Sequence, residues 1–183
     1  MTRWLLWLAS GLLLGGIVHF ATILYLPSTA TQNAYARISA IAPVNSVVPL
    51  PAPSAGKSVI PLMDPAFAAA VCRYDLNEAP LKLTVPVSPA YTSVTFYTDK
   101  DVAYYAINDR AAGRRSIELD LMTAAQKAQL PDDEDVAAAD RLIVESPSRA
   151  GLIVLRALAS EIGMMPAALN ALAGAKCEPQ PVD

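Results

Sequence analysis

The chain opens with a long apolar run and then changes to short alternating segments. Residues 4–26, WLLWLASGLLLGGIVHFATILYL, contain no Asp, Glu, Lys or Arg. A helix rises about 1.5 Å per residue, so this run is long enough to span the ~30 Å hydrocarbon core of a bilayer. Trp4, Trp7 and Tyr25 lie near its ends, where aromatic rings favour the headgroup layer. The pattern predicts a transmembrane anchor over residues 1–27.

The charges beside this anchor predict its orientation. Arg3 and the amino terminus precede the apolar run, and the next basic residue is Arg37. Because basic flanks tend to stay in the cytoplasm, we expect a single-pass protein of the bacterial inner membrane with a cytoplasmic N-terminus and a periplasmic domain. The alternative is a cleaved signal peptide, with Ala34-Tyr35-Ala36 as the cleavage site. The apolar core of such a peptide is about 7–15 residues long, which favours an uncleaved anchor here.

Small and polar residues inside the anchor are candidate contacts with a partner in the membrane. Gly11 and Gly15 have the spacing that lets two helices approach closely in lipid, and Gly16 follows directly. His19 is the only histidine in the chain, and an ionisable side chain within a membrane span is a candidate functional residue. We therefore expect contact with the lipid bilayer and with a membrane-protein partner or a second copy. Chance spacing of the glycines, and a neutral His19 bonded to a backbone carbonyl, are the alternatives.

Residues 28–62 have the pattern of a connector. Ala34, Ile38 and Ile41 recur at helical spacing, which predicts an amphipathic segment at the lipid surface. Pro43 should end this segment, because proline removes a helical hydrogen bond. Further prolines follow closely and predict an extended linker.

From residue 63 onwards, apolar positions recur in short runs. Seven runs are rich in Val, Ile, Thr and Tyr and are separated by turn residues, which is typical of β-strands. They are residues 69–76, 81–87, 91–98, 102–109, 116–122, 141–146 and 151–158. Short connections favour antiparallel pairing, while Thr123 should cap one helix and Pro166 should begin another. We predict a mainly β (α+β) fold, in which the transmembrane helix precedes a small antiparallel β-sandwich or curled sheet with a C-terminal helix, over residues 63–183.

The two cysteines, Cys72 and Cys177, lie in the first predicted strand and just beyond the last helix. In an oxidising periplasm they should form a disulfide that ties the C-terminus to the first strand. Closing a loop of about 100 residues contributes roughly 4–5 kcal/mol in the chain-entropy treatment. The alternative is a reactive thiol, which needs an activating base, and the only histidine is in the anchor.

Composition and motifs exclude several classes of function. Apolar residues make up 54% of the chain, charged residues 17%, and the net charge is −3, so a basic surface for nucleic acid is not expected. Without a histidine the domain cannot form a Ser-His-Asp set, and it has no Gly-rich phosphate loop or zinc-ligand spacing. The acidic residues 132–135 suit a solvated turn better than a calcium loop, since the Gly and the alternating spacing are missing. We expect no metal and no cofactor, and we favour a non-catalytic domain.

The clearest polar cluster is Asn108-Asp109-Arg110, at the end of a predicted strand. These side chains could bind a polar ligand, with Tyr97 and Tyr105 as an aromatic wall. The alternative is structural, because Asn-Asp commonly starts a turn and alternate tyrosines on a strand face core and surface. The structural alternative is favoured.

Arg156 interrupts an otherwise apolar strand. A buried guanidinium needs an ion-pair partner, and the candidates are Asp75, Glu118 and Glu145. We therefore predict a buried ion pair at Arg156 with a structural role.

Several short motifs follow one another in a distinctive order. They are DPAF, CRYDL, SVTFY, YYAINDR, IVESP, GLIVLRAL and a final Ala-Lys-Cys, together with Gly15-Gly16-x-x-His19 and the later Pro27. This order resembles the uncharacterised bacterial family known as domain of unknown function 1254, in its short membrane-anchored form. The likeness extends over most of the chain and implies a membrane-anchored, β-rich architecture. Longer members resemble two-domain β-rich periplasmic proteins, some of them linked to hydrolase activity.

Two hypotheses about function follow. The first is a non-catalytic envelope module that binds or scaffolds a membrane partner through its anchor and its sheet. The second is a small periplasmic hydrolase or ligand-binding domain that uses Asn108, Asp109, Arg110 and the nearby tyrosines. A pocket that gathers these residues with further carboxylates would favour the second hypothesis, and a packed sheet with them in turns would favour the first.

Overall fold

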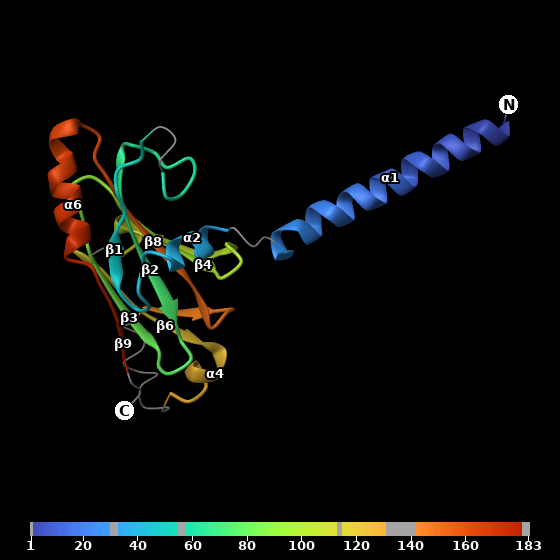
Figure 1. The fold of residues 1–183 in the computed structure, drawn as a ribbon. Coiled ribbons are helices and arrows are strands. Elements are labelled where there is room, and N and C mark those ends of the chain that lie inside the picture. The colour runs from blue at the N-terminus through green and yellow to red at the C-terminus, as the bar shows by residue number, and fades with distance from the viewer. Residues whose placement is uncertain (1, 30–32, 55–57, 113–114, 131–141, 181–183) are drawn as a thin grey trace. The chain divides into compact units, whose positions relative to one another are not determined.

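The structure is a computed structural model that describes residues 2–29, 33–54, 58–112, 115–130 and 142–180. Contacts between residues divide the chain into two compact units, Met1–Gln32 and Asn33–Asp183 (Figure 1). The first unit is the helix α1 (Thr2–Thr29). Its stretch Thr2–Leu26 is long and apolar enough to cross a membrane, and a signal sequence near an N-terminus has the same properties.

The second unit is a sandwich of two β-sheets (Figure 1). The five-stranded sheet has the order β1-β2-β8-β4-β5, with β1 (Val47–Pro49), β2 (Phe67–Asp75), β8 (Ala150–Leu158), β4 (Thr92–Thr98) and β5 (Ala103–Asn108). The four-stranded sheet has the order β7-β6-β3-β9, with β7 (Leu142–Ser146), β6 (Ser116–Thr123), β3 (Leu81–Pro86) and β9 (Lys176–Pro179). The predicted α+β fold class, with strands behind an N-terminal helix, is confirmed.

Alternate residues of the two sheets form the core between them. In β3, Leu83 and Val85 are fully buried in this core while Lys82 is exposed, as the period of two in a strand requires. Tyr74 of β2 and Phe96 of β4 meet them from the five-stranded sheet. Of the strands described so far, β3 shows this alternation most regularly.

Within the described ranges of this unit, four short helical segments and one longer helix connect or cover the strands. The short ones are α2 (Ala34–Ser39), α3 (Asp109–Ala112), α4 (Ala124–Lys127) and the 3-10 helix η1 (Ile162–Met164). The predicted cap of α4 is confirmed, because Thr123 and Gln126 form a reciprocal capping box. The predicted C-terminal helix is α6 (Met165–Ala173), with Pro166 in its first turn, and its buried Ala168 and Leu172 join the core.

The seven predicted strands correspond to β2 through β8, and the structure adds two that were not predicted. β1 lies within the predicted Pro-rich linker, where Pro49 is tolerated because β1 is an edge strand. β9 follows α6 and pairs with β3. One pairing also differs from the antiparallel expectation, since β7 runs parallel to β6. The end of β6 at Thr123 and the start of β7 at Leu142 are 19 positions apart, which is enough chain for a parallel return.

Part of the segment predicted as an amphipathic stretch and linker is built into the folded unit. Helix α2 packs against β2, and its Ile38 is fully buried in a second apolar cluster with Ala42, Leu50 and Val71. Ile38 therefore faces the sheet rather than lipid. The physical reason is that the five-stranded sheet has an apolar outer face over β2 and β8 that needs covering.

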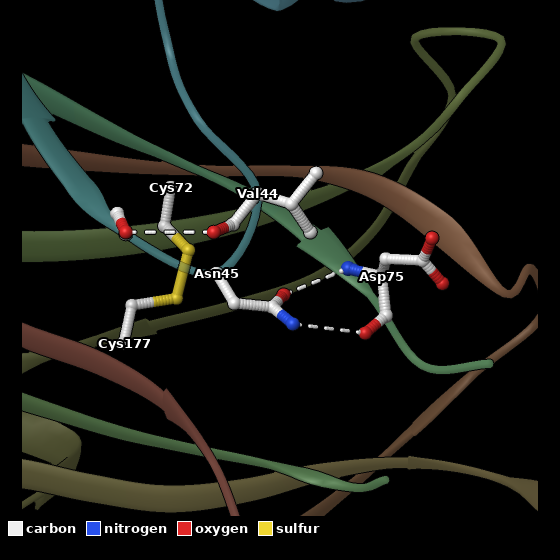
Figure 2. The surroundings of a disulfide bond; sticks show 6 residues. Val44, Asn45, Cys72, Asp75 and Cys177 are labelled. Carbon is white, nitrogen blue, oxygen red and sulfur yellow. Dashed lines mark hydrogen bonds between the residues drawn. A yellow bond between two sulfur atoms is a disulfide. The ribbon is translucent and has the colours of Figure 1, made fainter. Parts of the chain in front are cut away.

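Residues 34–50 form the segment that covers this face, named the covering segment, and Asn45 fastens it to β2 beside the disulfide between Cys72 and Cys177 (Figure 2). Its amide oxygen accepts a 2.9 Å hydrogen bond from the Asp75 backbone N–H, and its amide nitrogen donates to the Asp75 carbonyl at 3.2 Å. Its own backbone N–H donates to the Arg73 carbonyl at 2.7 Å. The φ of Asn45 is 54°, in the left-handed region that asparagine tolerates better than most residues. One side chain thus meets both the conformational and the hydrogen-bonding requirement of this turn.

Replacing Asn45 with alanine should therefore destabilise the domain by about 2–3 kcal/mol, through two lost hydrogen bonds and an unfavourable backbone conformation. Asn45→Gly is the matched control, because glycine loses the same bonds without the conformational penalty. Urea unfolding followed by circular dichroism should rank the glycine variant about 1 kcal/mol above the alanine variant. Equal stabilities would show that the backbone conformation of Asn45 contributes nothing.

Candidate functional site

The outer face of the five-stranded sheet changes from apolar to polar from one strand to the next. On β8, Leu152, Val154 and Arg156 lie on this face, because Ile153 and Leu155 between them point into the core. Leu152 and Val154 pack against the covering segment, whereas Arg156 is exposed. Strand β8 is therefore the boundary between a covered apolar half and an open half.

An apolar hollow of ≈ 270 Å³ lies on the covered half of this face. Its floor is formed by Ala69, Leu152 and Val154, and its walls include Leu50 and Phe67. The segment from Ile60 to Asp64 forms one rim, and the lining also includes Arg156, Tyr97, Ala34 and Asp101. The covering segment thus leaves part of the apolar sheet accessible.

Leu62, on that rim, is the most exposed large apolar side chain of the described residues. Its φ is 59°, a left-handed conformation that is uncommon for a residue other than glycine. Apolar exposure and an unfavourable backbone conformation therefore coincide at the mouth of the hollow. Such strain is often found where a chain is shaped for binding.

A second hollow, of ≈ 320 Å³, lies on the open half of the same face, and polar groups form a larger share of its lining than in the first, so we name it the polar hollow. Strand pairing places Ser93 beside Arg156, and Asn108 beside Ser93, across β8, β4 and β5. All three residues line this hollow, together with Thr95 and Tyr91. Arg156 lines both hollows and so joins them.

The predicted buried ion pair at Arg156 is wrong, because this side chain is exposed. Among the residues that the structure describes, its guanidinium has neither a hydrogen bond nor an ion pair. The proposed partner Glu145 instead lies 3.8 Å from the amino group of Lys127, in the exposed pair between β7 and α4. Arg156 is on the outer face by the period of two, and the covering segment does not extend over this end of β8.

The predicted cluster Asn108-Asp109-Arg110 forms the end of β5 and the start of α3. The side-chain oxygen of Asn108 accepts the Ala111 N–H at 3.0 Å, and an oxygen of Asp109 accepts the Thr92 N–H at 3.5 Å. Arg110 is exposed on α3. These bonds are those of a helix cap and a turn, although the Asn108 side chain also lines the polar hollow.

The structure does not bring the two predicted tyrosines to one wall. Tyr97 lines the apolar hollow on the outer face, whereas Tyr105 packs against Phe96 in the core, with ring centroids 5.8 Å apart. The register between β4 and β5 shifts at Phe96/Tyr97. Tyr105 is paired with Phe96 and shares its inward face, so it does not share a pocket with Tyr97. Tyr104 is the extra residue of the bulge, and it also packs against the core.

A cluster of hydroxyl groups that the sequence did not predict is centred on Tyr74, which is fully buried between the sheets. Its hydroxyl lies 3.0 Å from that of Ser146 and 3.3 Å from that of Ser148, and it accepts a hydrogen bond from Tyr104 at 3.1 Å. Burial raises the pKa of the Tyr104 phenol well above its ordinary value, so this hydroxyl stays neutral. Tyr74 occupies an ordinary inward position of β2, so no sequence signal distinguishes it. The cluster satisfies buried polar groups.

Carboxylates at the rim of the apolar hollow are already bonded within the fold. The two oxygens of Asp101 accept the Ala34 and Tyr35 N–H groups at 2.7 and 3.1 Å, which also anchors the start of α2. An oxygen of Asp64 accepts the Ala66 N–H at 2.9 Å. Over the described ranges, no group of three or more His, Cys, Asp or Glu side chains could hold a metal ion. The acidic residues 132–135 lie outside those ranges.

The candidate residues of the anchor lie on α1. A Cβ added at Gly11, Gly15 or Gly16 would meet nothing within 4 Å in this single chain. His19 contacts the neighbouring Phe20, with ring centroids 6.1 Å apart. Steps of four residues place Gly11, Gly15 and His19 along one side of the helix. That side is free for contact with another helix.

Comparisons with known proteins identify a family and a fold. The family model described as "Protein of unknown function (DUF1254)" matches residues 44–179. The VPA0106 protein from Vibrio parahaemolyticus has a similar structure, with a TM-score of 0.57 and 15% identity over 82% of this chain. An uncharacterized protein from Burkholderia cenocepacia gives 0.51 and 15% over the same share. This chain covers 37% and 39% of those two chains, so it spans less than two fifths of either. No curated protein matches the chain.

Proposed function

This chain belongs to the DUF1254 family, and on that premise we propose that it is a single-pass inner-membrane protein that displays a binding or scaffolding module in the periplasm. The observation that carries this proposal is the half-covered outer face of the five-stranded sheet. An apolar hollow and a polar hollow adjoin there, with an exposed guanidinium between them. Concave apolar surfaces with a few polar groups are the usual form of binding sites.

The polar groups elsewhere in the domain support binding rather than catalysis. Asn108 and Asp109 accept backbone N–H groups of a turn, and the hydroxyls around Tyr74 bond one another in the core. Neither set presents an activated nucleophile beside a base, which covalent catalysis requires.

A periplasmic position of the module is supported by the anchor and by the disulfide. Helix α1 is long and apolar enough to cross a membrane, and Arg3 precedes it. Cys72 and Cys177 are bonded to each other, and disulfides persist in oxidising compartments. Contact through the anchor is supported by the free side of α1 that carries Gly11, Gly15 and His19.

The proposal predicts what an amine-reactive, membrane-impermeant crosslinker will capture when it is applied to intact spheroplasts. The crosslinker should reach exposed lysines of the domain, such as Lys82 and Lys100, and recover the full-length protein with a partner or a second copy. Gly15→Leu should lower this recovery severalfold, because a large side chain separates closely packed helices. Gly16→Leu is the matched control, since its neighbouring position points about 100° away around the helix.

Two results would contradict the proposal. Crosslinking of the domain only in inside-out vesicles would place it in the cytoplasm. Equal recovery from Gly15→Leu, Gly16→Leu and the unchanged protein would show that the anchor is a tether with no partner contact of its own.

A further inference from the structure

We propose that the outer face of the five-stranded sheet binds one molecule of a medium-chain fatty acid such as dodecanoate, with its chain in the apolar hollow and its carboxylate on Arg156. This inference rests on the proposed binding function and names its ligand. It depends on three properties of the face: the size and lining of the apolar hollow, the unpaired charge at its end, and the polar hollow beyond that charge.

The apolar hollow suits a single hydrocarbon chain. Leu152, Val154 and Phe67 supply aliphatic and aromatic contacts, and the exposed Leu62 stands at the mouth where a chain would cover it. The volume of ≈ 270 Å³ is just below the range of about 300–1,000 Å³ for small-molecule sites. One chain fits such a space, whereas the two chains of a phospholipid do not.

The charge at the end of the hollow selects an anionic head. Within the described part of the chain, the exposed guanidinium of Arg156 has no hydrogen bond or ion pair. Asp101 and Asp64 also line the hollow, but their oxygens accept backbone N–H groups and, among the described residues, neither forms an ion pair with Arg156. A guanidinium binds a carboxylate through two parallel hydrogen bonds, so a fatty acid head matches it in both charge and geometry.

The polar hollow gives that head a hydrated surrounding. Ser93 of β4 is paired with Arg156 of β8, and Asn108 of β5 is paired with Ser93. Thr95 lies two positions beyond Ser93 on β4 and also lines the polar hollow. Their hydroxyl and amide groups can donate hydrogen bonds to a carboxylate or to the water around it. The face thus changes from apolar to polar in the same direction in which a fatty acid changes from hydrocarbon chain to carboxylate.

The test is photolabelling of the full-length protein in phosphatidylcholine nanodiscs with a diazirine derivative of dodecanoate. Labelling should saturate, and mass spectrometry should locate it on peptides from β8 and from residues 60–64. Excess dodecanoate should compete, whereas dodecyltrimethylammonium, which has the same chain and a cationic head, should not. Arg156→Gln should weaken labelling about tenfold, because it removes the charge that the head contacts. Leu62→Ser should weaken it a few-fold without disturbing the fold, since this side chain is fully exposed.

Arg149→Gln is the matched control, because Arg149 is also exposed but lines neither hollow. Equal labelling of Arg156→Gln and Arg149→Gln, or equal competition by the cationic amphiphile, would overturn the inference. Absent labelling would also overturn it. If the crosslinked partner is still recovered in that case, the proposed binding function stands without this ligand. If labelling is specific but no partner is recovered, the fatty acid site stands and the scaffolding role fails.

Discussion

Gly151→Ala is expected to destabilise the domain by about 3 kcal/mol or more, near the upper end for a single added methyl group. Gly151 begins the buried part of β8, between β2 and β4. A Cβ at this position would overlap the backbone carbonyl of Tyr97 and the phenol of Tyr74. The carbonyl is held in the β4 strand and the phenol in the buried hydroxyl cluster, so neither can move without breaking hydrogen bonds. Urea unfolding of the full-length protein, followed by far-UV circular dichroism, measures the change in free energy.

Gly163→Ala is the control for this substitution. A Cβ at Gly163 would meet nothing within 4 Å, and the residue is exposed in η1, so the change should stay within about 0.5 kcal/mol. Combining Gly151→Ala with Tyr74→Phe should not restore stability, because the Tyr97 carbonyl remains in the way. If Tyr74→Phe restored the stability, the Tyr74 hydroxyl alone would be what opposes a methyl group at position 151. A stability of Gly151→Ala equal to that of Gly163→Ala would contradict the packing of β2, β8 and β4 around this glycine.

The strands of the sandwich were predictable because each depends on a local property. Each strand is a short run rich in Val, Ile, Thr and Tyr, bounded by turn residues such as Pro89 and Asn77. The strands β2 to β8 could therefore be recognised one by one, even though β2 and β8 are buried on both faces. The partner of each strand is not a local property. The parallel alignment of β7 with β6, and the pairing of β9 with β3, depend on contacts between distant parts of the chain. The spacing of apolar residues along the chain therefore does not predict these two pairings.

The covering segment was not predictable for a different reason. Its prolines correctly indicated an extended chain, but an extended chain can be a free linker or an edge strand, and the sequence is the same in both cases. What decides between them is the exposed apolar face of β2 and β8, which Leu50 and Ile38 cover. That face follows from strand order, which the sequence does not specify.

The candidate site was only partly predictable. Asn108 was selected as a polar residue at a strand end, and it lines the polar hollow. Tyr105 was grouped with Tyr97 as an aromatic wall, but the face that each side chain takes depends on the pairing of β4 with β5, which places Tyr105 beside the inward-facing Phe96. Arg156 was recognised as unusual but assigned to the core, since the apolar residues beside it occupy both faces of β8. The apolar hollow itself depends on three separate segments and has no sequence signature.

Removing the disulfide is expected to have the largest effect on stability. The bond between Cys72 and Cys177 joins β2 of one sheet to β9 of the other, with the residues 105 positions apart, and both cysteines are buried (Figure 2). A bridge that closes a loop of about this length restricts the unfolded chain and contributes about 4–5 kcal/mol to folding. The doubly substituted Cys72→Ala/Cys177→Ala protein should therefore unfold at a much lower urea concentration than the oxidised protein, with β9 separating from β3 most readily because it is a short edge strand.

Adding a reductant separates the effect of the bridge from the effect of the two substitutions. Reduction should lower the stability of the unchanged protein to nearly that of the alanine variant, and it should leave the alanine variant unaffected. The difference that remains between the reduced protein and the variant measures the loss of two buried sulfur groups. An oxidised protein no more stable than its reduced form would show that the two sheets hold together without the bond. The bond would then report only the compartment of the domain, because a disulfide that adds no stability still requires an oxidising environment to form.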